Sequence, residues 1–167
     1  MSDMTVSKVQ IERLRVTSSK PFDTAVAALE AAVAHPDIIK VIKEAGMART
    51  FAEMENTFQR AAGGAKLMLF MRFDLGAILQ KESGLRTPKL LRFLIGNPLI
   101  MKEMTKHVPD AGSYAPVTVL VEERPDGVHF SYDRMASLLA PYGSSEALTV
   151  ARDLDATIEK LILDAAG

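Results

Sequence analysis

Residues 116–132, PVTVLVEERPDGVHFSY, contain the pattern that decides the fold class. Two runs rich in β-branched and aromatic residues, 116–123 and 128–132, flank the four residues Arg124-Pro125-Asp126-Gly127. Proline and glycine favour a tight turn, because proline restricts φ and glycine tolerates positive φ. The stretch therefore predicts a β-hairpin, and with it antiparallel pairing.

Three further segments are expected to be strands. Residues 66–73 carry apolar side chains on both faces, which predicts a strand in the middle of the sheet, covered on both sides. Residues 89–95 read as another largely buried strand. Residues 9–16 predict a first strand with a bulge, because the apolar alternation slips once in the middle.

Helix signals lie between these strands. Pro21 suits a first helical position, and apolar residues recur at helical spacing from Phe22 to Val33. Residues 37–45 could form a helix or a strand, and we favour a helix. Thr50-Phe51-Ala52-Glu53 has the spacing of a capping box for a helix that ends at Gly63-Gly64.

The second half of the chain contains three more predicted helices. Asp74 can cap a short helix through Gln80, and Asn97 followed by Pro98 predicts a helix over 99–107. From Ser145 an amphipathic helix runs to the C-terminus. Its polar side is expected to carry Arg152, Asp153, Asp155 and Glu159.

The mixture of helices and strands, with few strictly alternating βα units, predicts an α+β fold. We expect a two-layer sandwich of helices on a mainly antiparallel sheet, with an extra helical insertion around residues 36–64. No Pro/Gly/Ser-rich linker and no internal repeat is present, so the sequence predicts a single domain over residues 1–167.

Composition excludes several kinds of chemistry. The 167 residues contain no cysteine, so disulfides, thiolate nucleophiles and cysteine-based metal sites are excluded. The first twenty residues hold no continuous apolar run, which predicts a cytoplasmic location. The longest apolar stretch, 67–71, is too short to span a membrane. No Lys/Arg run is interleaved with aromatic residues, so we expect no nucleic-acid partner.

Charge is unevenly distributed. Residues 66–106 carry eight basic and three acidic side chains, whereas residues 107–167 carry four basic and ten acidic ones. A basic surface that binds an anion is one interpretation. Pairing between oppositely charged neighbouring elements or subunits is the other.

The turn Gly96-Asn97-Pro98 is a candidate anion site, because the first amides of a helix have no backbone partner. Arg92 precedes this turn on the same predicted strand. An Asn cap with a Pro start explains the same residues without a ligand.

Met101, Met104 and His107 lie at helical spacing and suggest a haem or copper site. At about 100° per residue, the first and last of them are about 120° apart, so they cannot all face one ion. We therefore predict no metal site. His107 and His129 are the plausible general bases near neutral pH apart from a perturbed carboxylate.

Aromatic residues lie at strand ends near Arg92 in the predicted fold. Tyr114 stands at a strand entry and Tyr132 at a strand exit, and together with Arg92 they could line a cleft. The candidate ligand-binding residues from the sequence are therefore Arg92, Asn97, His107, Tyr114, His129 and Tyr132. No catalytic residue and no cofactor can be assigned.

From Asp74 onward the chain combines several short motifs: Gly84-Leu85, Pro88-Lys89, Phe93-Leu94-Ile95-Gly96-Asn97-Pro98, Met104, Pro109-Asp110-Ala111-Gly112 and Tyr114-Ala115-Pro116 leading into 117–121, with Lys20-Pro21-Phe22 near the start of the chain. This combination resembles one known family, the domain of unknown function 302. The resemblance implies a compact α+β domain that often forms dimers, and it implies no reaction. The chain departs from the plainer family pattern at residues 36–64.

Two functions from different classes fit these observations. The first is a homo-oligomer, expected to be a dimer, that binds a small, largely apolar ligand, because the strands at 66–73 and 89–95 call for cover on both faces. The second is an enzyme that acts on an anionic small molecule held by Arg92 and the helix start after Asn97. A scaffold recognised through the acidic C-terminal third is a further possibility.

Overall fold

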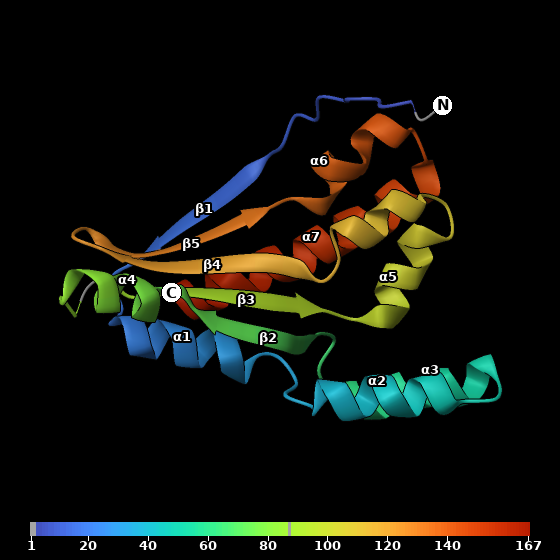
Figure 1. The fold of residues 1–167 in the computed structure, drawn as a ribbon, viewed down its shortest axis with the longest axis horizontal. Coiled ribbons are helices and arrows are strands. Elements are labelled where there is room, and N and C mark those ends of the chain that lie inside the picture. The colour runs from blue at the N-terminus through green and yellow to red at the C-terminus, as the bar shows by residue number, and fades with distance from the viewer. Residues whose placement is uncertain (1–2, 87) are drawn as a thin grey trace.

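The computed structural model describes residues 3–86 and 88–167. Within them, one antiparallel sheet has the strand order β1-β5-β4-β3-β2, and helices surround it (Figure 1). The strands are β1 (Arg13–Ser18), β2 (Met68–Asp74), β3 (Leu90–Gly96), β4 (Val117–Arg124) and β5 (Gly127–Asp133). The helices are α1 (Phe22–Ala31), α2 (Ile38–Met47), α3 (Phe51–Ala62), α4 (Leu75–Ser83), α5 (Pro98–Thr105), α6 (Met135–Leu139) and α7 (Ser145–Ala166), with short 3₁₀ turns at Pro109–Ser113 and Ala140–Tyr142. The predicted α+β class is confirmed.

The predicted hairpin is formed by β4 and β5. Arg124 pairs with Gly127 across the two-residue loop Pro125-Asp126. Gly127 has a φ of 138°, and a Cβ atom there would lie 2.6 Å from the carbonyl oxygen of Ser18. Glycine is therefore required at this position both by the turn and by the close approach of β1.

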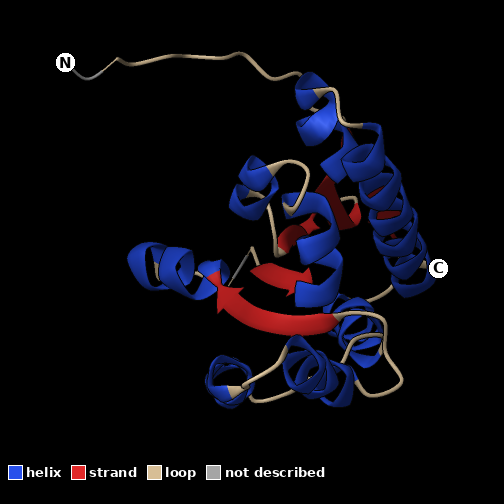
Figure 2. Ribbon diagram, turned by 90° about the vertical axis from the view of Figure 1, so that its right-hand side faces the viewer, coloured by secondary structure: helices blue, strands red, loops and turns tan. Residues whose placement is uncertain are grey.

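One face of the sheet forms the hydrophobic core. Its alternate side chains, among them Phe93, Val119 and Phe130, are buried against apolar residues of α1 and α7. Figure 2 shows the long helix α7 on one side of the sheet and α4 projecting on the other. We call the opposite sheet face, which α1 and α7 do not cover, the open face.

The expected position of the strand at 66–73 was wrong. We predicted a mid-sheet strand covered on both faces, whereas β2 lies at the edge of the sheet and pairs only with β3 among the named strands. Its first residue, Met68, is fully buried, but Met71 and Phe73 are 46% and 41% exposed. β2 is apolar on both faces because its first residue is buried and its exposed end also carries apolar side chains. The strand is not buried along its whole length. The other strand predicted as buried, β3, lies inside the sheet between β2 and β4, and up to Ile95 its buried residues alternate with exposed or partly exposed ones.

The expected bulge in the first strand was also wrong. Regular pairing begins only at Arg13, where β1 faces Asp133 of β5, and it continues without interruption to Ser18. Val9 and Ile11 lie before the strand, so the alternation of their side chains is not part of the strand pattern. The irregularity in the sheet lies in β2 instead, between Leu69 and Met71.

The helical stretch predicted at 36–64 is present as the helical hairpin α2–α3, below the sheet in Figure 1. The Asp37 carboxylate accepts a hydrogen bond from the amide of Lys40, and the Thr50 hydroxyl accepts one from the amide of Glu53. Both caps satisfy amides that have no partner within their helix. None of the described helices has the length and apolar character needed to cross a membrane.

Candidate functional site

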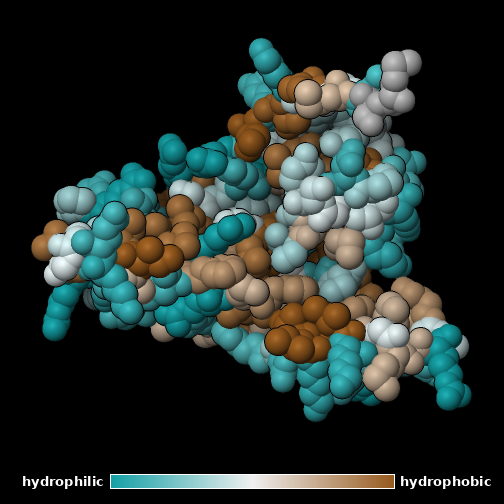
Figure 3. Space-filling model, viewed as in Figure 1, coloured by the Kyte–Doolittle hydropathy of each residue, from teal (hydrophilic) through white to brown (hydrophobic). Residues whose placement is uncertain are grey.

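A groove of about 560 Å³ lies over the open face. Its floor is formed by residues of β1, β3, β4 and β5, and Tyr114 and Leu138 border it at one end. Figure 3, which views the molecule from this side, shows a hollow in which hydrophilic and hydrophobic residues are mixed. This volume is in the range of pockets that bind small molecules.

The strand register arranges the open-face side chains in rows across the sheet. The middle row consists of Arg15 on β1, Ser131 on β5, Leu120 on β4, Arg92 on β3 and Phe73 on β2. Residues opposite each other on neighbouring strands point to the same face, so all five side chains belong to the open face. We refer to these five residues as the middle row.

The charges on either side of the middle row are paired within the protein. On one side, Arg13 donates two hydrogen bonds to the Asp133 carboxylate, at 2.5 and 2.8 Å, and this contact raises the pKa of Arg13. On the other side, Arg124 donates to Glu122 at 2.6 and 2.8 Å. These side chains have their partners already.

His129 belongs to the same side as Glu122 and is also paired. Its Nε2 lies 2.8 Å from a carboxylate oxygen of Asp126, and its Nδ1 lies 3.4 Å from the Thr17 hydroxyl. The hydrogen bond from His129 lowers the pKa of Asp126. The structure therefore places His129 at the hairpin end of the open face, in contact with a loop carboxylate.

The two arginines of the middle row differ from these neighbours. In the described residues, neither Arg15 nor Arg92 has a carboxylate within ion-pair distance, and Arg92 donates to the Thr118 hydroxyl at 3.3 Å. Their backbones are separated by three strand spacings, roughly 14 Å. Two guanidinium groups on one groove floor can bind a carboxylate or a phosphate, because their planar donors match two oxygen atoms at once.

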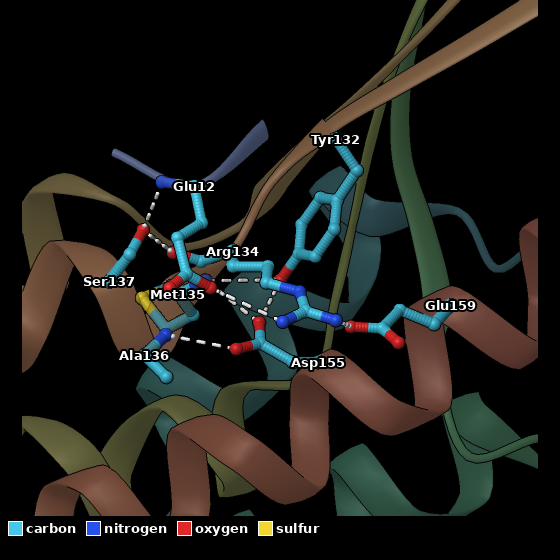
Figure 4. Close-up of polar contacts among 8 residues, drawn as sticks. All are labelled: Glu12, Tyr132, Arg134, Met135, Ala136, Ser137, Asp155 and Glu159. Atoms are coloured by element: carbon cyan, nitrogen blue, oxygen red, sulfur yellow. Dashed lines mark hydrogen bonds and ion pairs between the residues drawn. The ribbon is translucent and has the colours of Figure 1, made fainter. Parts of the chain in front are cut away.

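Tyr132 borders the groove, but its polar end lies on the other side of the sheet. The side chain is 1% exposed, and its hydroxyl donates to a carboxylate oxygen of Asp155 at 2.6 Å (Figure 4). Asp155 also accepts hydrogen bonds from the amides of Met135 and Ala136, at 2.7 and 3.0 Å. The carboxylate thus caps the first turn of α6 from a different helix.

The placement of Asp155 corrects the sequence-based expectation. We assigned it to the solvent-facing side of the last helix, whereas it is 5% exposed. The reason is α6, which packs against α7 at this position and brings unpartnered amides that need an acceptor. Asp155 is consequently a buried structural residue.

Beside this cluster, Arg134 joins three parts of the chain. Its guanidinium contacts Glu12, which precedes β1, at 3.2 Å, and Glu159 on α7 at 2.7 Å. The Ser137 hydroxyl accepts a hydrogen bond from the amide of Glu12 (Figure 4). These contacts hold the entry to β1, including the neighbouring groove residue Ile11, against α6.

We predict that Tyr132 makes the fold sensitive to alkaline pH. Burial, followed by the charge of Asp155, raises the pKa of Tyr132 far above its usual 10.0. Above pH 10 the unfolded chain therefore loses this proton while the folded chain keeps it. The free energy of unfolding should fall by up to about 1.4 kcal/mol per pH unit there.

Urea unfolding between pH 9 and 11 measures this slope. Tyr142 must be replaced by Phe in both proteins compared, because hydrogen bonding to Tyr114, burial and Asp110 raise the pKa of Tyr142 to about 12. In that background, Tyr132→Phe should flatten the decline. An equal slope in the presence and absence of Tyr132 would contradict the assignment.

The structure gives Asn97 a capping role. Its Oδ1 accepts a hydrogen bond from the amide of Leu99 at 2.9 Å, and its Nδ2 donates to the carbonyl oxygen of Lys66 at 3.1 Å. One of the amides considered for an anion is thus already bonded. Arg92 lies four residues before Gly96 on β3, roughly 13 Å along the strand.

The remaining predicted site residues lie apart from each other. His107 is exposed beyond the end of α5. Tyr114 borders the groove and contacts Tyr142. The groove therefore brings together Arg92, Tyr114 and Tyr132 of the predicted set, and Asn97, His107 and His129 lie outside its lining. In residues 3–86 and 88–167, no three His, Asp or Glu side chains are placed to hold a metal ion.

Comparisons with known proteins agree with this architecture. The chain is similar to a crystal structure of an uncharacterised conserved DUF302 protein from Bacillus stearothermophilus, with a TM-score of 0.57 and 15% sequence identity. The similarity covers 92% of this chain and 94% of that one, and at this identity it shows the fold alone. A search of curated proteins finds no match. The family model "Domain of unknown function DUF302" matches residues 43–164, from within α2 to near the end of α7. The chain therefore belongs to the DUF302 family.

Proposed function

We propose that this protein binds a small anionic molecule in the groove on its open face. The observation that carries the proposal is the contrast within that face: the flanking charges are paired, and the two arginines of the middle row have no carboxylate partner among the residues that the structure describes. An unpaired arginine in a groove offers several donors to a ligand without first breaking an internal ion pair. The family membership assigns no reaction, and this function requires none.

The alternative, an enzyme that holds an anion at the helix start after Asn97, receives less support. It requires Arg92 and the first amides of α5 to share one anion. The Asn97 side chain bonds the Leu99 amide itself, and Arg92 is separated from Gly96 by roughly 13 Å of strand. The middle row offers a better-placed pair of cationic groups.

Thermal unfolding with added anions tests the proposal. Phosphate, sulfate, acetate and octanoate are the probes, each added to the full chain at constant ionic strength. At a concentration of ten times Kd, at least one probe should raise Tm by about 3–5 °C. The double variant Arg15→Gln/Arg92→Gln should lose this shift.

Arg152→Gln is the matched control, because Arg152 is exposed on α7, away from the open face. It changes the net charge in the same direction as each groove substitution and should keep the full Tm shift. If no probe raises Tm in the parent protein, or if the control loses the shift equally, the proposed function is wrong.

We also propose that the protein is a homodimer, formed through the outer face of α2. Ile39, Ile42 and Met47 are 83%, 55% and 73% exposed on this side of the helix, and the exposed Lys43 lies between Ile39 and Met47. Lys40 and Glu44 lie together at one edge of this face and form an ion pair at 3.9 Å within the helix. Two α2 helices packed antiparallel across a two-fold axis would bury the apolar residues and bring Lys40 of each helix near Glu44 of the other.

The proposal places the protein in the cytoplasm, in keeping with a chain that contains no cysteine. The proposed function includes no nucleic-acid partner and no membrane partner. A pure scaffold would need no unpaired arginines in a groove, which is why ligand binding is the preferred function.

A further inference from the structure

Arg92 has apolar side chains next to it in four directions on the open face. Along β3, the residues two before and two after it are Leu90 and Leu94. Across the sheet, it is opposite Leu120 on β4 and Phe73 on β2. The two same-face neighbours along β3 and the two residues directly opposite Arg92 are therefore apolar, and the guanidinium also contacts the hydroxyl of Thr118, diagonally across β4, at 3.3 Å.

The apolar surroundings extend to the edge of the sheet. Met71 is opposite Leu94 on the open face, and Met71 and Phe73 are 46% and 41% exposed. Leu90, Leu94 and Leu120 are partly exposed. Together these five residues form what we call the apolar strip, which runs from Leu120 in the groove, past Arg92, to β2.

The two arginines and the apolar strip are next to each other on the open face, and this arrangement indicates which kind of ligand fits. A small hydrophilic anion would occupy the guanidinium groups and leave the strip in water. A molecule with an anionic head and an aliphatic tail would pair with Arg92 and Arg15 and remove apolar surface of the strip from water at the same time. The charge and the apolar surface are thus complementary to one amphiphile.

We infer that the ligand of the open face is a soluble anionic amphiphile, a monocarboxylate with an aliphatic chain. The inference rests on the proposed function and adds the chemical class of the ligand. The carboxylate lies between Arg92 and Arg15, beside the Ser131 hydroxyl, and the chain lies over Leu94, Met71 and Phe73.

A chain-length series measured by isothermal titration calorimetry tests the inference. Acetate, butanoate, hexanoate and octanoate are titrated into the full chain, with 1-octanol as the neutral probe. Affinity should rise by up to about threefold to fourfold for each added methylene. Octanol should bind much more weakly than octanoate, because it has no charge for the arginines.

Two variants separate the head from the tail. Phe73→Ser should reduce the gain per methylene and leave acetate binding unchanged, because Phe73 contacts only the tail. Arg92→Gln should weaken every carboxylate by a similar factor and keep the chain-length slope. Arg152→Gln should change neither.

The outcomes distinguish this inference from the proposed function. If short anions bind and chain length has no effect, the amphiphile is wrong and anion binding stands. If no carboxylate binds, both are wrong. If Phe73→Ser converts a dimer into a monomer, the apolar strip is a subunit contact. If the protein binds anionic lipid vesicles and no soluble carboxylate, the apolar strip is a membrane contact. Either result overturns the inference.

Discussion

Replacing Asp155 by Ala should lower the free energy of unfolding by about 3 kcal/mol or more. Its carboxylate accepts hydrogen bonds from the Tyr132 hydroxyl and from the amides of Met135 and Ala136. A buried donor left without an acceptor costs about 1–3 kcal/mol, and the Met135 amide would keep only a longer contact, of 3.4 Å, to the Tyr132 hydroxyl. Because the site is buried, water cannot replace the carboxylate without opening the packing between α6 and α7.

Urea unfolding at pH 7 measures this loss, and two variants calibrate it. Tyr132→Phe removes one donor and keeps both amide contacts, so its cost should be about 1–2 kcal/mol. Asp153→Ala, on the exposed side of the same helix, should cost less than about 0.5 kcal/mol. A loss below 1 kcal/mol for Asp155→Ala would show that this carboxylate does not hold α6.

Ile42→Glu should convert the proposed homodimer into a monomer. Ile42 lies on the outer face of α2, one helical turn after Ile39. Across a two-fold axis, a glutamate here would be buried against the apolar residues of both helices, and moving a charge out of water into an apolar contact is unfavourable. The fold itself should be unaffected, because the side chain is 55% exposed in the single chain.

Size-exclusion chromatography with light scattering at micromolar concentration measures the change. Ile78→Glu is the matched control, since Ile78 is also an exposed isoleucine on a helix, 67% exposed on α4. The parent and the control should have twice the mass of the chain, and Ile42→Glu should have the mass of one chain. A monomeric parent, or an equal loss in the control, would exclude α2 as the dimer contact.

The elements that could be predicted from the sequence depend on local chemistry. Pro125-Asp126-Gly127 specifies the β4–β5 turn, because its conformation is set by the residues within it. Thr50 and Asn97 were identified as caps since a cap requires only the next two or three residues. The two helices within residues 36–64 follow from the same local signals.

What could not be predicted depends on contacts between distant segments. The edge position of β2 follows from the strand order, which no local pattern specifies. Burial of Asp155 depends on α6, whose first amides must find an acceptor. The amphipathic pattern of α7 depends only on the residues of that helix and carries no information about α6. It therefore assigned Asp155 to the polar side.

The candidate site was predicted in part. Arg92 was singled out from its position on a predicted strand, whereas Arg15 was missed because the first strand was expected over 9–16 with a bulge and none of its residues was considered for the site. With β1 beginning at Arg13, the alternation places Leu14 and Val16 in the core and Arg15 on the open face. Its alignment with Ser131, Leu120 and Arg92 still required the register of four strands.

A titration of ¹⁵N-labelled protein with octanoate, followed by two-dimensional NMR, tests the central claim most directly. The account predicts saturable shifts concentrated at the backbone amides of Arg15, Ser131, Leu120 and Arg92, and their loss in Arg15→Gln/Arg92→Gln. Shifts centred on the start of α5 at Leu99, or no saturable shifts on the open face, would contradict it.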